Sequence, residues 1–258
     1  LSKVLYPNDG TDEGRRLRLK QQHFFVSCSL QDMLISLEKR SIPVEEFPDH
    51  WTVQLNDTHP AIAVAELMRL LIDQHRLDWD KAWEITNRSV AYTNHTLLPE
   101  ALEKWDLSLF RNLLPRHLEL IYEINRRFLQ QVRLKYPGND SILRKLSIID
   151  EEGGKAIRMA HLATIGAHHV NGVAALHSDL IKRQLLPEFA ELWPEKFTNV
   201  TNGVTPRRWV ALANPELSKL LDKEIGPNWI TNMDLLLELE KKENDSNFLD
   251  LFASAKLS

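Results

Sequence analysis

The segment Trp51-Thr52-Val53-Gln54-Leu55-Asn56-Asp57-Thr58-His59-Pro60 passes from a short β-prone stretch into a polar loop, and a helical pattern follows it. Apolar residues recur near a 3.6-residue period from Ala61 to His75, and Pro60 stands where helices commonly begin. Strand, loop and helix in this order form a βα unit. Ligands bind at the carboxyl ends of strands in α/β sheets, so the loop residues Asn56 to His59 are favourably placed for a site.

The rest of the chain is mainly of helical type, with few candidate strands. Helices are predicted over residues 78–92, 116–136, 155–170, 173–184, 215–224 and 231–243. Asp78 is the expected N-cap of the first of these, and Phe197 to Val200 is a further candidate strand. Residues 159–170 are apolar, small and almost uncharged, which is typical of a helix buried on most sides. The pattern predicts a helix-rich α/β fold.

A turn signal at Asn202-Gly203 precedes shorter and more charged helices. This change in composition places a domain boundary near residue 200, with residues 1–200 before it and 201–258 after it. The first residue is Leu1, and the last residues continue a helical pattern without a cap. Both ends are therefore expected to be internal to a longer protein.

Charge and composition exclude several classes of protein. The 258 residues carry a net charge of −4, which does not favour a nucleic-acid partner, and no apolar run approaches the length of a membrane span. The single cysteine, Cys28, excludes an internal disulfide, fits a reducing cytoplasm and is expected to pack in the core. The basic run 15–20 is interpreted as a solvated helix face.

Two polar corners are candidate binding sites. The first, Asn56 to His59, can be explained as a helix N-cap, and the second, Tyr92-Thr93-Asn94-His95-Thr96, as a helix C-cap. Taken together they also suit a carbohydrate site, because sugar hydroxyls need paired donors and acceptors of the kind that Asn, Asp and His supply. Both interpretations stay open from the residues alone.

Histidines at positions 161, 168, 169 and 177 do not match a common metal-ligand spacing, and the pattern His-Glu-x-x-His is absent. These histidines are interpreted as core or capping residues, and no metal is predicted.

Eight motifs in order resemble those of the α-glucan phosphorylases, the enzymes of glycogen, starch and maltodextrin breakdown. They extend along essentially the whole chain, at residues 4–9, 17–22, 54–60, 77–83, 92–96, 98–103, 114–117 and 201–209. The resemblance identifies an internal part of such an enzyme.

The resemblance implies two Rossmann-like lobes of the GT-B type. Residues 1–200 would be the C-terminal part of the N-terminal lobe, and residues 201–258 the first helices of the C-terminal lobe, which binds the cofactor. The implied enzyme is a glycosyltransferase that moves the terminal glucosyl unit of an α-1,4-glucan to inorganic phosphate and releases glucose 1-phosphate. It would use pyridoxal 5'-phosphate, act in the cytoplasm and form a homodimer, without nucleic-acid or membrane partners.

The resemblance also implies roles for individual residues. His95 would contact the glucosyl unit through its imidazole and its carbonyl group, and Asn202 would bind the same sugar. Asp57, His59 and Glu103 would line the pocket beside the anomeric carbon.

Further residues are implied around this centre. Asp9 matches the carboxylate of a mobile gate loop, and Val173 and Trp209 would pack near the cofactor ring, whose lysine lies outside this chain. A second, surface site for glucan storage would comprise Asn125, Ser147, Glu151 and Lys155. Asn125 is expected on the exposed side of its helix, with Glu151 and Lys155 on one face if their segment is helical.

The chain departs from the animal enzymes at two places. Gly10, Thr11 and Asp12 replace an asparagine and two phenylalanines of an inhibitor site, and Ile35 and Ser36 replace two arginines that bind a nucleotide activator. An enzyme without AMP control is therefore expected. The isolated 258 residues are expected to be inactive, since the cofactor lysine is missing. The alternative is a helical carbohydrate-binding module or a GT-B glycosyltransferase segment without phosphorolysis.

Overall fold

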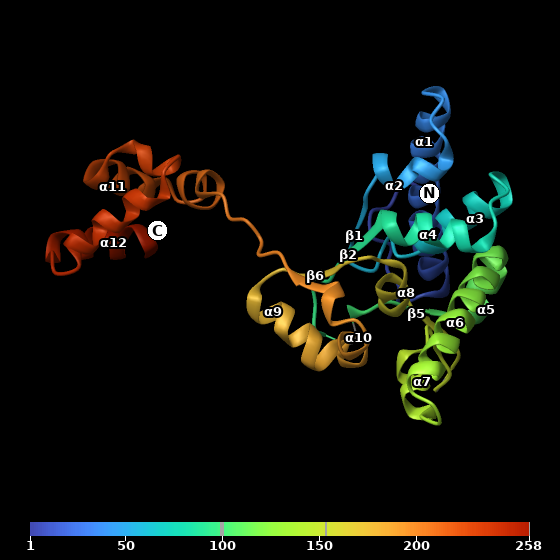
Figure 1. Cartoon of the computed structure of the whole chain (residues 1–258). Helices are drawn as coiled ribbons and strands as arrows, with labels where there is room; N and C mark the ends of the chain where they lie inside the picture. Colours follow the sequence, from blue (N-terminus) through green and yellow to red (C-terminus); the bar gives the residue numbers. More distant parts are fainter. Residues whose placement is uncertain (99–100, 153, 258) are drawn as a thin grey trace. The chain divides into compact units, whose positions relative to one another are not determined.

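The computed structural model describes residues 1–98, 101–152 and 154–257. Pro99 and Glu100, within the motif 98–103, lie outside the described residues. The chain divides into two compact units, Leu1–Thr201 and Asn202–Ser258, and each is described by itself (Figure 1).

The first unit combines helices with two small sheets. Its α-helices are α1 (Asp12–Lys39), α2 (Phe47–His50), α3 (Ala63–Arg69), α4 (Trp79–Ser89), α5 (Leu107–Leu113), α6 (Pro115–Lys135), α7 (Asp140–Leu146), α8 (Met159–Gly166), α9 (Ala175–Leu180) and α10 (Pro187–Leu192). Its shorter helical segments are η1 (Val44–Glu46), η2 (Leu70–Gln74), η4 (Ile181–Leu185) and η5 (Pro194–Lys196). Its strands are β1 (Val53–Asn56), β2 (Val90–Thr93), β3 (Lys104–Asp106), β4 (Ile149–Asp150), β5 (Ala156–Arg158), β6 (Val170–Gly172) and β7 (Phe197–Asn199).

The main sheet is parallel throughout, in the order β1-β2-β6-β7. One row of side chains across it pairs Leu55 with Tyr92, Tyr92 with Val170, and Val170 with Phe197. All four are buried, as expected of a parallel sheet whose connections are helical. The prediction of a helix-rich α/β fold is confirmed.

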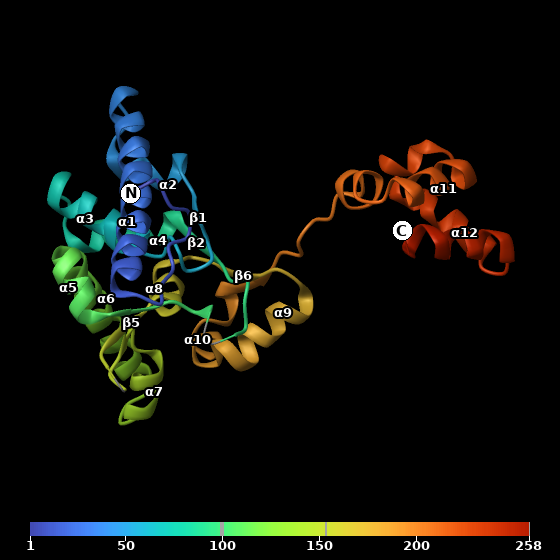
Figure 2. The same ribbon diagram turned by 180° about the vertical axis from the view of Figure 1, so that it is seen from behind.

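The expected strand before the Asn56 loop and the expected helix after it are both present, as β1 and as α3 with η2. This helix is buried, with Leu67 and Leu71 fully covered, because α1, α4 and α6 all pack on it. In both views α1, the long blue helix, runs beside α3 (Figures 1 and 2).

The helix predicted over residues 78–92 extends three residues too far at its C-terminal end. Asp78 caps α4 by accepting a hydrogen bond from the Lys81 amide at 2.9 Å, as expected, but the helix stops at Ser89. Val90 to Thr93 instead form β2, because this β-branched and aromatic stretch pairs with β1. The corner that contains His95 therefore follows a strand, and its interpretation as a helix C-cap is wrong.

The predicted helix 155–170 is also shorter than expected. Residues 156–158 form β5 between β3 and β4 in an antiparallel sheet, and residues 170–172 form β6. Only α8 is helical, and it is buried on nearly all sides, as its composition predicted. Gly166 permits this packing, since a Cβ there would lie 2.5 Å from both Cγ atoms of Val64 on α3.

The long helix α1 corrects two expectations. Cys28 is exposed rather than in the core. The basic run is not uniformly solvated, because Arg15, Arg16 and Lys20 are exposed but the Arg18 side chain is only 16% accessible. Arg18 therefore faces inward.

The second unit contains η6 (Arg207–Leu212), α11 (Pro215–Ile225), η7 (Pro227–Ile230), η8 (Met233–Lys242) and α12 (Ser246–Leu257). Helix α11 agrees with the prediction for 215–224, whereas the segment predicted as a helix over 231–243 is of the tighter 3-10 type. Trp229 is fully buried here and its indole N–H donates to Asp222 at 2.8 Å. Among the described residues, no helix combines the length and the apolar character needed to cross a membrane.

Candidate active site

Polar residues gather where the four parallel strands end. The Asp57 amide, just after β1, donates to the Thr93 carbonyl at 2.9 Å, and the Asn94 amide, just after β2, donates to the Asn171 carbonyl at 3.0 Å. The Thr93 hydroxyl also donates to Asn171 Oδ1 at 2.8 Å. These bonds join the two polar corners at one edge of the sheet, which is where α/β proteins bind ligands.

Asp57 has a left-handed backbone, with φ at 65°. Its Oδ1 accepts the Thr58 amide at 2.6 Å, and the buried Thr58 hydroxyl has no hydrogen-bond partner among the described residues. The N-cap interpretation of this loop is wrong, because α3 begins several residues later and its N-cap, Ile62, makes no side-chain capping bond. Strained backbone at a strand end is a common feature of binding loops.

His95 is exposed while its neighbour Asn94 is buried. The Asn94 side chain accepts the Thr96 amide at 3.1 Å and donates to the Tyr92 hydroxyl at 3.1 Å. Burial raises the pKa of Tyr92, which keeps this phenol protonated. The buried residues Tyr92 and Asn94 thus fix the conformation of the loop, and the His95 side chain remains exposed.

His177 on α9 lies close enough to His95 for the two charges to interact. Burial lowers the pKa of His177, and the charge on His95 lowers it further. Its Nδ1 accepts the Val173 amide at 3.1 Å, which leaves the proton on Nε2. The half-buried Val173 directly follows β6, and His95 follows β2; because these two strands are parallel neighbours, both residues lie at the same edge of the sheet.

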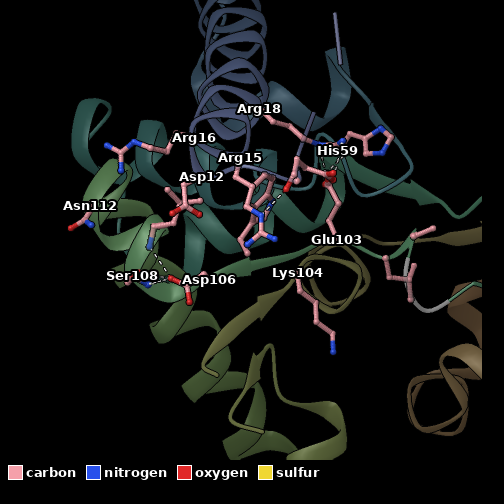
Figure 3. A pocket seen from close by; sticks show the side chains of 16 residues that line it. Asp12, Arg15, Arg16, Arg18, His59, Glu103, Lys104, Asp106, Ser108 and Asn112 are labelled. Atoms are coloured by element: carbon pink, nitrogen blue, oxygen red, sulfur yellow. Dashed lines mark hydrogen bonds and ion pairs between the residues drawn. The ribbon is translucent and has the colours of Figure 1, made fainter. Parts of the chain in front are cut away.

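A second group of side chains lies beside His59 and surrounds a cavity of about 980 Å³ (Figure 3). Glu103 takes hydrogen bonds on Oε1 from Arg18 Nε at 3.0 Å and from Gln22 Nε2 at 2.9 Å. Asp9 is mostly exposed, with Oδ2 3.8 Å from Arg18 Nη1. Asp9, His59 and Glu103, three of the predicted pocket residues, therefore line one cavity.

The other two residues predicted at the centre, Asn202 and Trp209, belong to the second unit. Both are exposed within it, Trp209 to 64%. The first unit alone supplies His95, Asp57, His59, Glu103, Asp9 and Val173.

The residues predicted for glucan storage meet at another cavity of about 540 Å³, between α6, α7 and β4. Asn125 is buried rather than exposed, because its side chain serves the chain that enters β4: Nδ2 donates to Ser147 Oγ at 3.2 Å and Oδ1 accepts the Ile148 amide at 2.8 Å. Glu151 and Lys155 are not in a helix: Glu151 follows β4 and Lys155 precedes β5. Glu151 and Lys155 are exposed and line the cavity with Asn125 and Ser147.

Away from these sites, a buried ion-pair cluster surrounds Glu66 on α3. Arg69 donates to both carboxylate oxygens at 2.7 and 2.9 Å, Ser27 donates at 2.6 Å, and His117 Nε2 lies 2.5 Å from Oε2. Burial by itself raises the pKa of Glu66, but bonds from its partners outweigh burial and lower this pKa far below the ordinary value. His23, Glu66 and His117 are the candidate metal-ligand group in the described ranges. The Arg69 guanidinium already neutralises the carboxylate, so the geometry supports an ion-pair network.

Sequence reasoning missed three residues of the candidate site: Arg18, Gln22 and His177. Arg18 and Gln22 are four residues apart, the spacing that puts two side chains on one helix face, and this was the available signal for the first two. Nothing in the sequence pairs either residue with Glu103, more than 80 positions away. No sequence pattern pointed to His177, because His95, its neighbour in space, follows β2 and lies far from it in the sequence.

Comparison with known proteins gives concordant matches. Residues 1–258 match the family model for carbohydrate phosphorylases. The chain is 62% identical over 240 residues to a glycogen phosphorylase of Synechocystis sp., covering 93% of this chain and 28% of that protein. It is 53% identical over 257 residues to one of Chlamydia pneumoniae, covering 100% and 31%. It is 49% identical over 264 residues to the brain form from Rattus norvegicus, covering 99% and 32%. The chain thus spans less than a third of the length of these relatives.

Proposed function

Because this chain belongs to the carbohydrate phosphorylase family, we propose that the protein carrying it is an α-1,4-glucan phosphorylase of the glycogen phosphorylase type. It transfers terminal glucosyl units to inorganic phosphate and gives glucose 1-phosphate. The relatives named glycogen phosphorylase support this proposal, since their identity extends over nearly the whole chain. The observation that carries it is the meeting of the Asp57 and His95 loops at the carboxyl edge of the parallel sheet.

We assign the glucosyl subsite to the His95 loop. The imidazole of His95 binds a sugar hydroxyl, and its carbonyl oxygen faces the positive charge that develops at the anomeric carbon. A fixed dipole aimed at developing charge stabilises the transition state more than the ground state. The exposure of His95 and the rigid support from Asn94 agree with this role. Asn202 in the second unit is assigned to the same sugar.

The wall of the subsite is assigned to Asp57, His59 and Glu103, with Asp9 at its entrance. Asp9 lies on an exposed segment, as a gate residue would, while Glu103 is only 11% accessible and held by Arg18. During transfer the bond between the anomeric carbon and the glucan oxygen breaks, the departing oxygen takes a proton, and a phosphate oxygen bonds to the same face of the sugar. The wall orients the glucosyl unit for this exchange.

The two units are assigned to the two lobes of a GT-B fold. The first unit would be part of the N-terminal lobe, and the second the start of the C-terminal lobe. The parallel sheet with ligand residues at its carboxyl edge fits one Rossmann-like lobe.

Pyridoxal 5'-phosphate is the proposed cofactor, and its phosphate relays a proton to the substrate phosphate when bound. Val173 fits one apolar wall of such a site, since it is half-buried at the carboxyl end of β6. The described residues do not supply the anchoring amine there. Lys196, whose pKa burial lowers to about 8, precedes β7 and donates to the Thr164 carbonyl at 3.0 Å, so it belongs to the amino edge of the sheet. The anchoring lysine is therefore proposed in the part of the protein beyond this chain.

The remaining assignments concern the complete protein. Asn125, Ser147, Glu151 and Lys155 would form a glucan storage site, with the buried Asn125 and Ser147 shaping a surface from which Glu151 and Lys155 reach the sugar. The substrates are an α-1,4-glucan and inorganic phosphate, and a cytoplasmic homodimer is proposed.

The test is phosphorolysis by the complete protein. Incubation with maltoheptaose and inorganic phosphate should release glucose 1-phosphate, and the reverse reaction should extend maltoheptaose. A protein that binds the glucan but releases no glucose 1-phosphate, even when loaded with pyridoxal 5'-phosphate, would refute the proposal. If the protein instead transfers glucose from a nucleotide sugar, the result would favour a GT-B glycosyltransferase without phosphorolysis.

A further inference from the structure

We propose that Arg18 is a positioning residue, which holds the Glu103 carboxylate and the Tyr6–Asp9 segment in one arrangement beside His59. The inference rests on the proposed function for its effect on activity, because Glu103 and His59 are the walls of the proposed sugar pocket. The contacts themselves do not depend on that function. Figure 3 shows Arg18, His59 and Glu103 around the same cavity.

The first part of the arrangement is the set of hydrogen bonds to the Glu103 carboxylate. Arg18 Nε and Nη2 lie 3.0 and 2.8 Å from Glu103 Oε1, and Gln22 Nε2 donates to the same oxygen at 2.9 Å. Both donors come from α1 and are one helical turn apart, so they approach from a single rigid element. A nearly buried carboxylate must be paired, and this pair fixes its direction as well as its charge.

The donors bond to only one of the two oxygens of the Glu103 carboxylate, and this asymmetry is the feature that points to a ligand. Among the described residues, the bonds to the Glu103 carboxylate all end on Oε1, while Oε2 is buried and has no hydrogen-bond partner. By contrast, Glu66 in the buried ion-pair network uses both of its oxygens with Arg69. Fixing Oε1 keeps an acceptor available for a hydroxyl or a water that belongs to the substrate complex.

The second part is the segment on the other side of Arg18. The Arg18 guanidinium lies 5.1 Å from the centre of the Tyr6 ring, within the range of a cation–π contact. The Tyr6 hydroxyl lies 2.9 Å from His59 Nδ1, and the two rings meet edge to face. Tyr6 has a φ of 51°, which is strained for a bulky residue and persists only when surrounding contacts hold it.

Arg18 therefore contacts both Glu103 and the Tyr6–Asp9 segment. Glu103 ends the 98–103 motif, and Tyr6 leads to Asp9, whose carboxylate is 3.8 Å from Arg18 Nη1. Arg15 and Arg16 on the same helix are exposed and do not contact Glu103 in any described interaction. Without Arg18, the carboxylate would lose its charged partner and the Tyr6 ring its cation.

The activity test uses Arg18→Gln and Arg18→Lys in the complete enzyme, with Lys20→Gln, an exposed residue of the same helix, as the matched control. Arg18→Gln should lower kcat/KM for phosphorolysis by about 10- to 100-fold, since misplacement of a pocket wall by about 1 Å can cost 100-fold. Arg18→Lys should recover part of the loss, because lysine keeps the charge but lacks the guanidinium fork. Lys20→Gln should match the wild type.

A double-mutant cycle with Glu103→Gln separates positioning from general damage. If Arg18 acts through Glu103, then Arg18→Gln should lower kcat/KM far less in the Glu103→Gln background than in the wild type. Losses that simply multiply would show that Arg18 does not act through Glu103, and would overturn the inference.

Hydrogen exchange of the same complete proteins gives a readout that does not need activity. In Arg18→Gln, amides of residues 4–10 and 101–106 should exchange faster, while those of α6 stay protected; in Lys20→Gln neither segment should change. Unchanged exchange in both segments would overturn the inference even if activity fell. An enzyme without phosphorolysis would refute the proposed function, and the exchange comparison would still decide the role of Arg18.

Discussion

The side chains of Asn125 and Ser147 meet at 3.2 Å inside the protein, although 22 positions separate them in the sequence. Asn125 also accepts the Ile148 amide, so a residue of α6 fixes the chain that leads to Glu151 and Lys155. The two pairs therefore differ in kind: Asn125 and Ser147 are structural, whereas Glu151 and Lys155 are available to a ligand.

Glucan binding at this surface should depend on Glu151 and Lys155. With the catalytic cleft of the complete protein blocked by a tight inhibitor, maltoheptaose should still bind with millimolar affinity, because surface hydrogen bonds are worth about 1 kcal/mol each. Replacing both residues with alanine should abolish this binding, and Lys182→Ala, at an exposed site elsewhere, should leave it intact. Calorimetric titration with maltoheptaose measures this binding. If the double alanine variant binds maltoheptaose as tightly as the wild type, this surface does not bind glucan.

Turnover should depend strongly on His95. His95→Ala in the complete enzyme removes contacts that are strongest in the transition state, at a cost of roughly 2–4 kcal/mol, or about 30- to 1000-fold in rate. Asn202→Ala should show a smaller loss. His50→Ala, an exposed histidine before β1, is the control. The measurement is kcat for glucose 1-phosphate release, and wild-type turnover in folded His95→Ala would remove this residue from the sugar site.

Stability should depend on Glu66. Its side chain is fully buried and paired with Arg69 and His117, so Glu66→Gln leaves the partly buried Arg69 guanidinium without its charged partner. Breaking a buried pair in this way costs about 3–5 kcal/mol in the free energy of unfolding. Glu84→Gln, which breaks only exposed pairs, should change stability little. Denaturant unfolding of both variants is the test, and equal midpoints would contradict the expectation.

His161 should make stability depend on pH. Burial, together with the nearby Arg158 charge, lowers the pKa of His161 from 6.5 to about 4, and its neutral Nδ1–H donates to the Ser147 carbonyl at 3.0 Å. Between pH 6.5 and 4 the unfolded chain binds the proton and the folded chain does not. This contribution to stability is therefore complete above pH 6.5 and is lost as the pH falls towards 4.

The change should amount to about 3 kcal/mol, from about 1.4 kcal/mol for each pKa unit. Unfolding free energies of the wild type and of His161→Gln, measured from pH 7 to pH 4, isolate it, because the variant lacks the titrating group. Parallel curves for the two proteins would show that His161 titrates normally.

Control by AMP should be absent. Ile35 and Ser36 occupy the positions where the resemblance to animal enzymes would place two arginines, and the Ile35 side chain is exposed on α1. An exposed isoleucine offers a nucleotide phosphate no charge. The rate of the complete enzyme should be equal with and without saturating AMP, and activation of several-fold would mean that a different site binds the nucleotide.

Local patterns in the sequence predicted β1, α3, α6, α11 and the burial of α8, because periodicity and capping residues report on the nearest neighbours along the chain. They failed at Val90 to Thr93, where pairing with β1 decides between helix and strand. The same limit applied to the site. The two polar loops could be singled out from residue type, but the meeting of Arg18 with Glu103 depends on tertiary packing that no local pattern records.

The order of the main sheet, β1-β2-β6-β7, is also the order in which a ribosome would make the strands. Each strand after β1 therefore finds one neighbour already synthesised, and in the described sheet only β1 must wait for a later strand before it can pair. Chains fold as they emerge, from the amino end first. The long interval is between β2 and β6, so the loop with His95 should acquire its final shape only when Asn171 arrives to accept its backbone hydrogen bond. Formation of the sheet is thus vectorial, and the corner that contains His95 is completed late in it.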